Sequence, residues 1–152
     1  MPMTDRPSCF LGIDCGTQST KAVLLDGASG AVLGVGSAPH AIDLRPDGTS
    51  EQDPAGWVAA AVAAVRAVVA EVAPGEVRGI GVSGQQHGLV ALDARGGVVR
   101  RAKLWNDTTT GAEGESLTAA LGGPEAALAA TGNRFLSGYT APKLLWLRRH
   151  EP

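Results

Sequence analysis

The chain has 152 residues, of which 44% are hydrophobic and 18% charged, a composition typical of a soluble globular protein with one real core. Its formal net charge of −2 gives no reason to expect a nucleic acid or an anionic membrane as a partner. There is no apolar run of about 18 residues to predict a transmembrane helix. Residues 1–8 are interpreted as a loose leader without the apolar core of a signal peptide, so we expect a cytoplasmic protein.

Two cysteines, Cys9 and Cys15, bracket the first predicted strand. Six residues at about 3.3 Å each put them roughly 20 Å apart. A disulfide needs Cα atoms within about 7 Å, so these two cannot pair with each other. Thiols that are not joined fit a reducing compartment. Neither cysteine has a His or Cys neighbour at metal-ligand spacing, so both are interpreted as structural.

Three strands are predicted at the start of the chain, over about 9–14, 20–26 and 31–38. A turn signal at 27–30 separates the second from the third. Strands joined by such short links must be antiparallel neighbours. The polar stretch 39–52 contains two prolines and one glycine, and it is predicted to be an irregular loop that could border a ligand site.

A long helix is predicted next, because Asp53 suits the N-cap and Pro54 suits the first helical position. Its apolar residues recur at i, i+4, i+8, i+11 and i+15, and they are Trp57, Ala61, Val65, Val68 and Val72. Pro74 and Gly75 end it. A helix packed on a sheet explains this pattern, and we assign the helix no chemistry.

The remaining elements complete an α/β pattern. A fourth strand is predicted over 77–82, a fifth over 89–93, and a short extended run over 98–104 after a turn at 94–97. The helix should make a right-handed crossover into the fourth strand. Helices are then predicted over about 110–121, 124–131 and 141–150.

The turn between the first two strands is the first candidate site. Asp14 ends the first strand and faces a turn in which glycine lets the backbone approach a phosphate. The candidate phosphate-binding residues are Gly16, Thr17, Gln18, Ser19 and Lys21, with Thr20 as a further donor. A carboxylate beside such a turn suits a divalent cation, usually magnesium held through water. The turn is neither a Walker-type loop nor a dinucleotide fingerprint. The alternative is an ordinary hairpin whose turn is polar.

Two further motifs carry polar side chains that suit a sugar. Gln85, Gln86 and His87 lie between glycines at the end of a predicted strand, where ligands of open α/β sheets bind. The alternative is that His87 is a turn residue bonded to backbone; zinc is not expected there. Trp105, Asn106 and Asp107 place an aromatic ring beside amide and carboxylate groups, which is a common way to hold a sugar. The alternative is a buried ring followed by a helix cap.

Taken together and in this order, the motifs resemble the FGGY family of carbohydrate kinases and, within it, the xylulose branch. The similarity runs from about residue 10 to the end, and the matching segments are 12–21, 50–54, 81–88, 104–108, 131–133 and 140–146. Two departures stand out. Cys15 replaces the more usual Leu and should alter packing only, whereas Gln86 replaces Met and could change a contact to the sugar.

The resemblance implies a fold, a reaction and roles. The fold would be the ribonuclease-H-like mixed sheet of the actin and sugar kinase superfamily, with residues 9–152 as an N-terminal domain whose second lobe is absent. The reaction would be transfer of the ATP γ-phosphoryl group to O5 of D-xylulose, giving D-xylulose 5-phosphate, with Mg²⁺. Asp14 would orient magnesium and the phosphates, Gly16 and Thr17 would touch the phosphate chain, and Gln86 and His87 would hold the sugar.

The family's general base lies well after residue 152, so we expect this chain to be an inactive N-terminal fragment. Alternatives are a related FGGY kinase for ribulose, gluconate, glycerol or another polyol, and a non-catalytic sugar-binding fragment. An actin-like or chaperone-like ATPase is a weaker alternative, because only the first motif supports it. The resemblance leaves a homodimer open.

Overall fold

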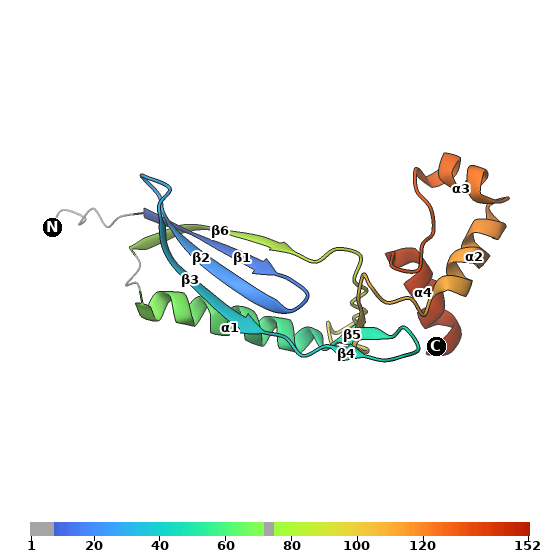
Figure 1. Cartoon of the computed structure of the whole chain (residues 1–152), viewed down its shortest axis with the longest axis horizontal. Coiled ribbons are helices and arrows are strands. Elements are labelled where there is room, and N and C mark those ends of the chain that lie inside the picture. Colours follow the sequence, from blue (N-terminus) through green and yellow to red (C-terminus); the bar gives the residue numbers. More distant parts are fainter. Residues whose placement is uncertain (1–7, 72–74) are drawn as a thin grey trace. The chain divides into compact units, whose positions relative to one another are not determined.

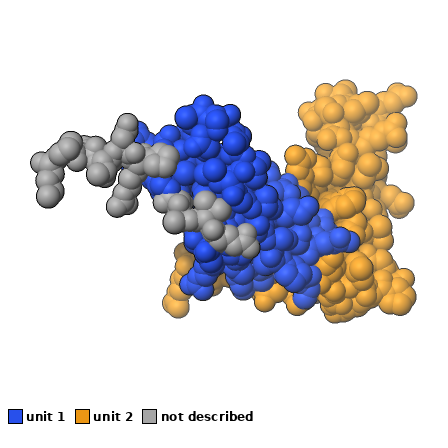
Figure 2. Space-filling model, turned by 60° about the vertical axis from the view of Figure 1, so that its left-hand side comes forward, with its two compact units in different colours: residues 1–41, 55–85 blue, residues 42–54, 86–152 orange. Residues whose placement is uncertain are grey.

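The structure, a computed structural model, describes residues 8–71 and 75–152, which belong to two compact units (Figure 2). Unit 1 comprises the described residues of 1–41 and 55–85, and unit 2 comprises residues 42–54 and 86–152. The predicted leader lies outside the described residues apart from Ser8, which begins the first strand. The expectation of one domain over 9–152 stays a prediction.

Unit 1 is built on a four-stranded sheet in the order β3-β2-β1-β6 (Figure 1). The strands β1 (Ser8–Cys15), β2 (Ser19–Asp26) and β3 (Val32–Pro39) run antiparallel to their neighbours. The strand β6 (Glu76–Gly84) returns to pair with β1 in parallel. These pairings confirm the predicted antiparallel strands and the strand that rejoins the sheet after the helix.

The helix α1 (Pro54–Glu71) covers one face of this sheet (Figure 1). The core consists of alternate residues of β1 and β2 with two residues of the helix, namely Cys9, Leu11, Ala22, Leu24, Ala64 and Val68. A Cβ at Gly36 of β3 would collide with the carbonyl oxygen of Ala64, so the glycine lets helix and strand pack closely.

The predicted apolar face of α1 is confirmed where it is described. Val68 is buried, and Trp57, Ala61 and Val65 are partly buried, while Val72 lies outside the described residues. Two small residues that the pattern did not include, Ala60 and Ala64, are also buried on this face. Their burial follows from the close packing of the helix on the sheet.

The predicted irregular loop over 39–52 is wrong in part. It contains β4 (Asp43–Leu44) and β5 (Ser50–Gln52), which join β7 (Ala102–Lys103) in a small sheet of unit 2, in the order β4-β5-β7. The chain reverses through Gly48, whose φ of 94° favours glycine, and this turn sets the two short strands against each other.

The predicted fifth strand over 89–93 is also wrong, whereas the extended run predicted over 98–104 contains the two-residue strand β7. The structure gives single bridges, Leu89 to Lys103 and Leu92 to Val98, and the two-residue β7. The amide of Asp93 donates to the carbonyl of Gly97 at 2.8 Å, which closes a tight turn after a few residues. Residues 89–93 and 98–104 both belong to unit 2, and neither segment is part of the four-stranded sheet.

The three predicted C-terminal helices are confirmed as α2 (Gly111–Ala120), α3 (Pro124–Thr131) and α4 (Thr140–His150). Pro124 opens α3 at a position where a missing N–H is tolerated, and Gly132 ends it with a φ of 71°. None of the helices in the described part of the chain is long and apolar enough to span a bilayer.

Candidate functional site

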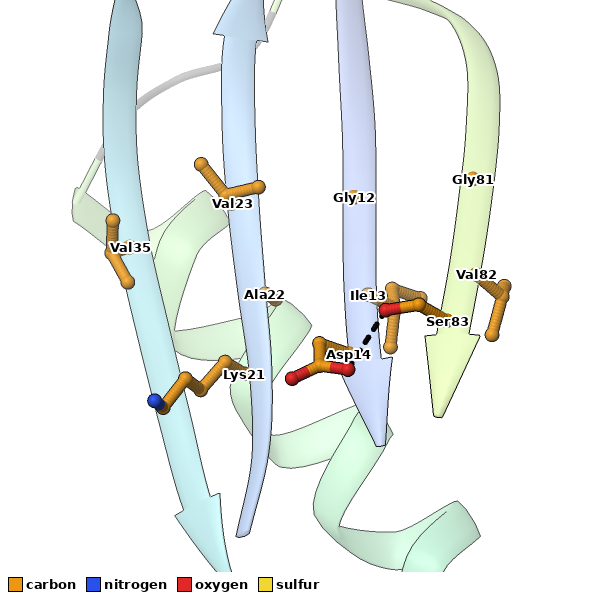
Figure 3. Close-up of a pocket in the computed structure, with 10 residues that line it drawn as sticks. All are labelled: Gly12, Ile13, Asp14, Lys21, Ala22, Val23, Val35, Gly81, Val82 and Ser83. Carbon is orange, nitrogen blue, oxygen red and sulfur yellow. Dashed lines mark hydrogen bonds between the residues drawn. The ribbon is translucent and has the colours of Figure 1, made fainter. Parts of the chain in front are cut away.

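Asp14 presents its carboxylate on the face of the sheet opposite α1. In the register of the sheet it pairs with Lys21 of β2 and with Ser83 of β6. The Ser83 hydroxyl donates to Oδ1 of Asp14 at 2.8 Å, as Figure 3 shows. The Asp14 residue is exposed, so one oxygen is oriented by the protein while the group still faces solvent.

Asp14, Lys21 and Ser83 line a cavity of about 520 Å³ on this face (Figure 3). The remaining lining residues are small or apolar, and they are Gly12, Ile13, Ala22, Val23, Val35, Gly81 and Val82. A mostly apolar cavity with a few polar residues in its lining is typical of a small-molecule site.

The turn that follows Asp14 is fixed by hydrogen bonds at its base and along one side. The amide of Gly16 donates to the Ser19 carbonyl at 3.1 Å, and a Cβ on Gly16 would approach that oxygen to 3.2 Å. The Thr17 hydroxyl donates to the Gln85 side-chain oxygen at 3.2 Å. The amide of His40 donates to the Gln18 carbonyl at 2.8 Å.

The donor set of unit 1 fits a magnesium ion that keeps most of its own ligands. In residues 8–71 and 75–152 there is no cluster of three or more His, Cys, Asp or Glu side chains that could hold a metal by themselves. Magnesium bound to a nucleotide takes its ligands from phosphate oxygens and water with one or two carboxylates. A single exposed carboxylate beside a glycine turn is compatible with that pattern.

The second predicted motif divides between the two units. Gln85 belongs to unit 1, whereas Gln86 and His87 belong to unit 2, where both are exposed. His87 adopts a φ of 60°, which is uncommon for a residue other than glycine. Its imidazole stacks on the ring of Tyr139, with 4.6 Å between the ring centroids. A neighbouring aromatic ring thus supports the side chain.

Trp105, Asn106 and Asp107 differ sharply in exposure. The Trp105 residue is 51% exposed, so the alternative of a buried core ring does not fit. Asn106 is exposed, and its Oδ1 accepts a hydrogen bond from the Ser50 hydroxyl at 2.9 Å. Asp107 is fully buried, with Oδ2 accepting from the Ser50 amide at 2.9 Å and Oδ1 from the Thr109 amide at 3.0 Å.

Beneath Asp107 lies a charged network that holds this loop in unit 2. The Lys103 ammonium is 3.3 Å from Asp107 and 3.2 Å from Glu51, and it lies 4.0 Å from the centre of the Trp146 ring. Arg100 pairs with Glu51 at 2.7 Å. Buried charges need such partners, so these groups fix the backbone that carries Trp105 and Asn106.

Sequence reasoning missed the supporting roles of three residues. Ser83 could have been found by extending the alternation of β6, since it faces the same side as Asp14. Lys143 lies within the quoted segment 140–146, and Tyr139 directly precedes it, but the sequence offers no sign that either residue contacts His87.

Comparison with known proteins supports the family resemblance that the motifs indicate. The model of the "FGGY family of carbohydrate kinases, N-terminal domain" matches residues 9–152. The xylulose kinase of Haemophilus influenzae is 42% identical over 149 residues, covering 94% of this chain and 30% of that protein. The xylulose kinase of Streptomyces coelicolor is 43% identical over 143 residues, covering 93% of this chain and 29% of that protein.

Solved structures give the same result for the fold. The crystal structure of xylulose kinase from Rhodospirillum rubrum superimposes with a TM-score of 0.87 at 34% identity, over 95% of this chain and 30% of that chain. A xylulose kinase structure from Brucella ovis gives 0.84 at 40% identity, over 94% and 30% respectively. These neighbours are sugar kinases of the actin-like ATPase fold. The chain spans about 30% of the length of the relatives it matches.

Proposed function

Because this chain belongs to the FGGY family of carbohydrate kinases, we propose that it forms the N-terminal part of a kinase for D-xylulose. The reaction would transfer the γ-phosphoryl group of ATP to D-xylulose, giving D-xylulose 5-phosphate. Support for the sugar comes from the relatives, which are named xylulose kinases at about 40% identity. A cytoplasmic location and a homodimer belong to the same proposal.

One observation carries the phosphate half of the proposal. Asp14 is an exposed carboxylate, oriented by Ser83, beside a turn whose base is closed by the Gly16 amide. Phosphoryl transfer depends mainly on positioning and charge neutralisation. Asp14 would hold Mg²⁺ through water, and the bound ion would neutralise charge on the phosphates.

The turn residues have distinct proposed roles. The backbone at Gly16 and Thr17 would lie against the phosphate chain, with hydroxyl and amide donors from Gln18 and Ser19. The Lys21 ammonium is exposed and lines the same cavity as Asp14, so it would add positive charge there. These residues all belong to unit 1 and can be tested without reference to the sugar.

The sugar half of the proposal rests on the exposed groups of unit 2. Trp105 would stack on the apolar face of the sugar, and Gln86, His87 and Asn106 would exchange hydrogen bonds with its hydroxyls. Asp107 has both carboxylate oxygens occupied inside the protein. We therefore propose that Asp107 serves the sugar by holding the loop that carries Trp105 and Asn106.

Sugar binding is tested by tryptophan fluorescence. Titration with D-xylulose should produce a saturable change in emission that Trp105→Phe abolishes and Trp57→Phe retains. D-ribulose, D-gluconate and glycerol should bind more weakly. A stronger response to one of them would reassign the substrate within the family, and a response that survives Trp105→Phe would contradict the assignment of this ring. Gln86→Met tests whether the unusual glutamine alters sugar preference.

Turnover is a separate question. Since the resemblance puts the general base beyond residue 152, we expect no sugar-dependent ADP release from the 152-residue chain in a coupled assay. Xylulose-dependent release would refute the fragment hypothesis while leaving the family unchanged. Sugar binding without turnover would agree with both halves of the proposal.

A further inference from the structure

Lys143 is a buried cation whose hydrogen bonds go to the backbone. It lies in α4 with no part of its surface exposed. Its Nζ donates to the carbonyl oxygen of Gly138 at 2.6 Å and to that of His87 at 2.7 Å. Desolvation by burial lowers the pKa of Lys143 from 10.5 to about 8, although the nearby Asp107 carboxylate opposes this shift.

Burying an ammonium in this position is unfavourable compared with burying an apolar side chain of similar length. Elsewhere on this helix the inward positions carry apolar side chains: Pro142 is buried, and Leu145 and Leu147 are partly buried. What an ammonium adds is directional donors. Here two of them reach main-chain oxygens, one from a segment 56 residues away along the chain.

The oxygen that lies 56 residues away along the chain belongs to a strained residue, His87. His87 has a φ of 60°, a left-handed conformation that costs a side-chain-bearing residue free energy and persists only where neighbours fix it. The orientation of its carbonyl is set by Lys143 and, more weakly, by the Thr140 hydroxyl at 3.4 Å. A donor aimed at this oxygen therefore also stabilises the backbone conformation that directs the imidazole.

The second oxygen belongs to the residue before Tyr139, whose ring stacks on the His87 imidazole. Gly138 also packs against the carbonyl of Trp105, and a Cβ at this position would collide with it. One ammonium thus links the backbone under His87 to a turn that carries its stacking partner and touches the backbone of Trp105.

We propose that Lys143 is a positioning residue of the sugar site, which holds the carbonyls of His87 and Gly138 together and thereby sets the orientation of the His87 ring against Tyr139. The inference deepens the proposed function and rests on it for the ligand alone. The arrangement of the two rings can be tested without any sugar.

The test uses the imidazole resonances of the 152-residue chain, which has three histidines, His40, His87 and His150. In the unmodified protein the Cε1–H signal of His87 should carry the ring-current shift of Tyr139, and Tyr139→Leu should remove it. Lys143→Met should move the His87 signal toward the position found in Tyr139→Leu. D-Xylulose affinity should fall about tenfold in the same variant.

The chain offers an internal control and a matched variant. His150 lies on the same helix, stacked on Trp146 with 5.1 Å between centroids, so its unchanged signal reports that α4 is intact. Arg148→Met removes an exposed cation from that helix and should leave the His87 signal and the sugar affinity unchanged. A His87 signal that stays in place in Lys143→Met overturns the inference.

A measurement on the unmodified protein decides the case if Lys143→Met loses its fold. Scalar couplings across hydrogen bonds should connect the Lys143 Nζ to the carbonyl carbons of His87 and Gly138, and their absence would overturn the inference. If no sugar binds the unmodified protein, the proposed function fails, while the shift of the His87 signal in Lys143→Met still tests the positioning role.

Discussion

The buried carboxylate of Asp107 offers a sharp test of how the loop carrying Trp105 is held. Every group that contacts its two oxygens is a hydrogen-bond donor. These donors are the amides of Ser50 and Thr109, the Thr109 hydroxyl and the Lys103 ammonium. In Asp107→Asn one oxygen becomes an NH₂ group that must face a donor. The substitution therefore breaks at least one hydrogen bond and removes the charge opposite Lys103.

The expected loss follows from the strength of these contacts. A hydrogen bond to a charged group contributes about 1.5–3 kcal/mol, and breaking a buried ion pair from one side costs about 3–5 kcal/mol. Glu51 stays within 3.2 Å of Lys103, so the ammonium keeps a partner. We therefore expect the free energy of unfolding to fall by about 3 kcal/mol, near the lower end of the ion-pair range.

The assay is urea unfolding followed by tryptophan emission in a Trp57→Phe background, so that the signal comes from Trp105 and Trp146 of unit 2. Asp93→Asn is the matched control, because the Asp93 carboxylate caps an exposed turn through the amides of Arg95 and Gly97. Asparagine retains an oxygen for this role, and the change should stay below about 1 kcal/mol. An equally small change in Asp107→Asn would refute the reasoning.

Two further predictions concern packing and pH. Gly36→Ala should lower the free energy of unfolding by about 1–3 kcal/mol, because the added Cβ meets the Ala64 carbonyl. The control is Gly81→Ala in the same sheet, where the added Cβ meets open space. A thermal melt followed by circular dichroism should show the loss in Gly36→Ala and no change in Gly81→Ala. The pKa of Lys143 is about 8 in the folded protein and lies below its ordinary value of 10.5. Between about pH 8 and 10.5 the unfolded chain therefore binds more protons at this residue than the folded chain does. Lys143 then makes the free energy of unfolding rise with pH. Urea titrations at several pH values should show that rise in the unmodified chain and not in Lys143→Met; the charged groups that act on Lys143 are Asp107 and Lys103.

Local patterns in the sequence were enough to predict unit 1. The first strand that ends at Asp14, the short polar turn and the apolar face of α1 each depend on residues close together in the chain. The spacing of apolar residues and the residue types of a turn predict such features directly. The return of β6 then follows from the helical connection, because a crossover through a helix is the usual way to bring a strand back in parallel, and it needs no particular side chain.

Unit 2 was harder to predict because its elements depend on distant partners. The strands β4 and β7 have two residues each, too few to show a period. The position of Asp107 inside the protein depends on Ser50, which is 57 residues away. The role of Lys143 depends on a backbone oxygen of His87, and a single sequence carries no signal for such a contact.

The most direct test of the phosphate site uses the backbone amide signals of the hairpin. Adding inorganic tripolyphosphate with Mg²⁺ to the 152-residue chain should shift the amides of residues 16–21 in a saturable way. In Asp14→Ala the dependence of these shifts on Mg²⁺ should disappear. Shifts confined to other parts of the chain, or a magnesium dependence that survives Asp14→Ala, would contradict the assignment of this carboxylate to the metal and phosphates of a nucleotide.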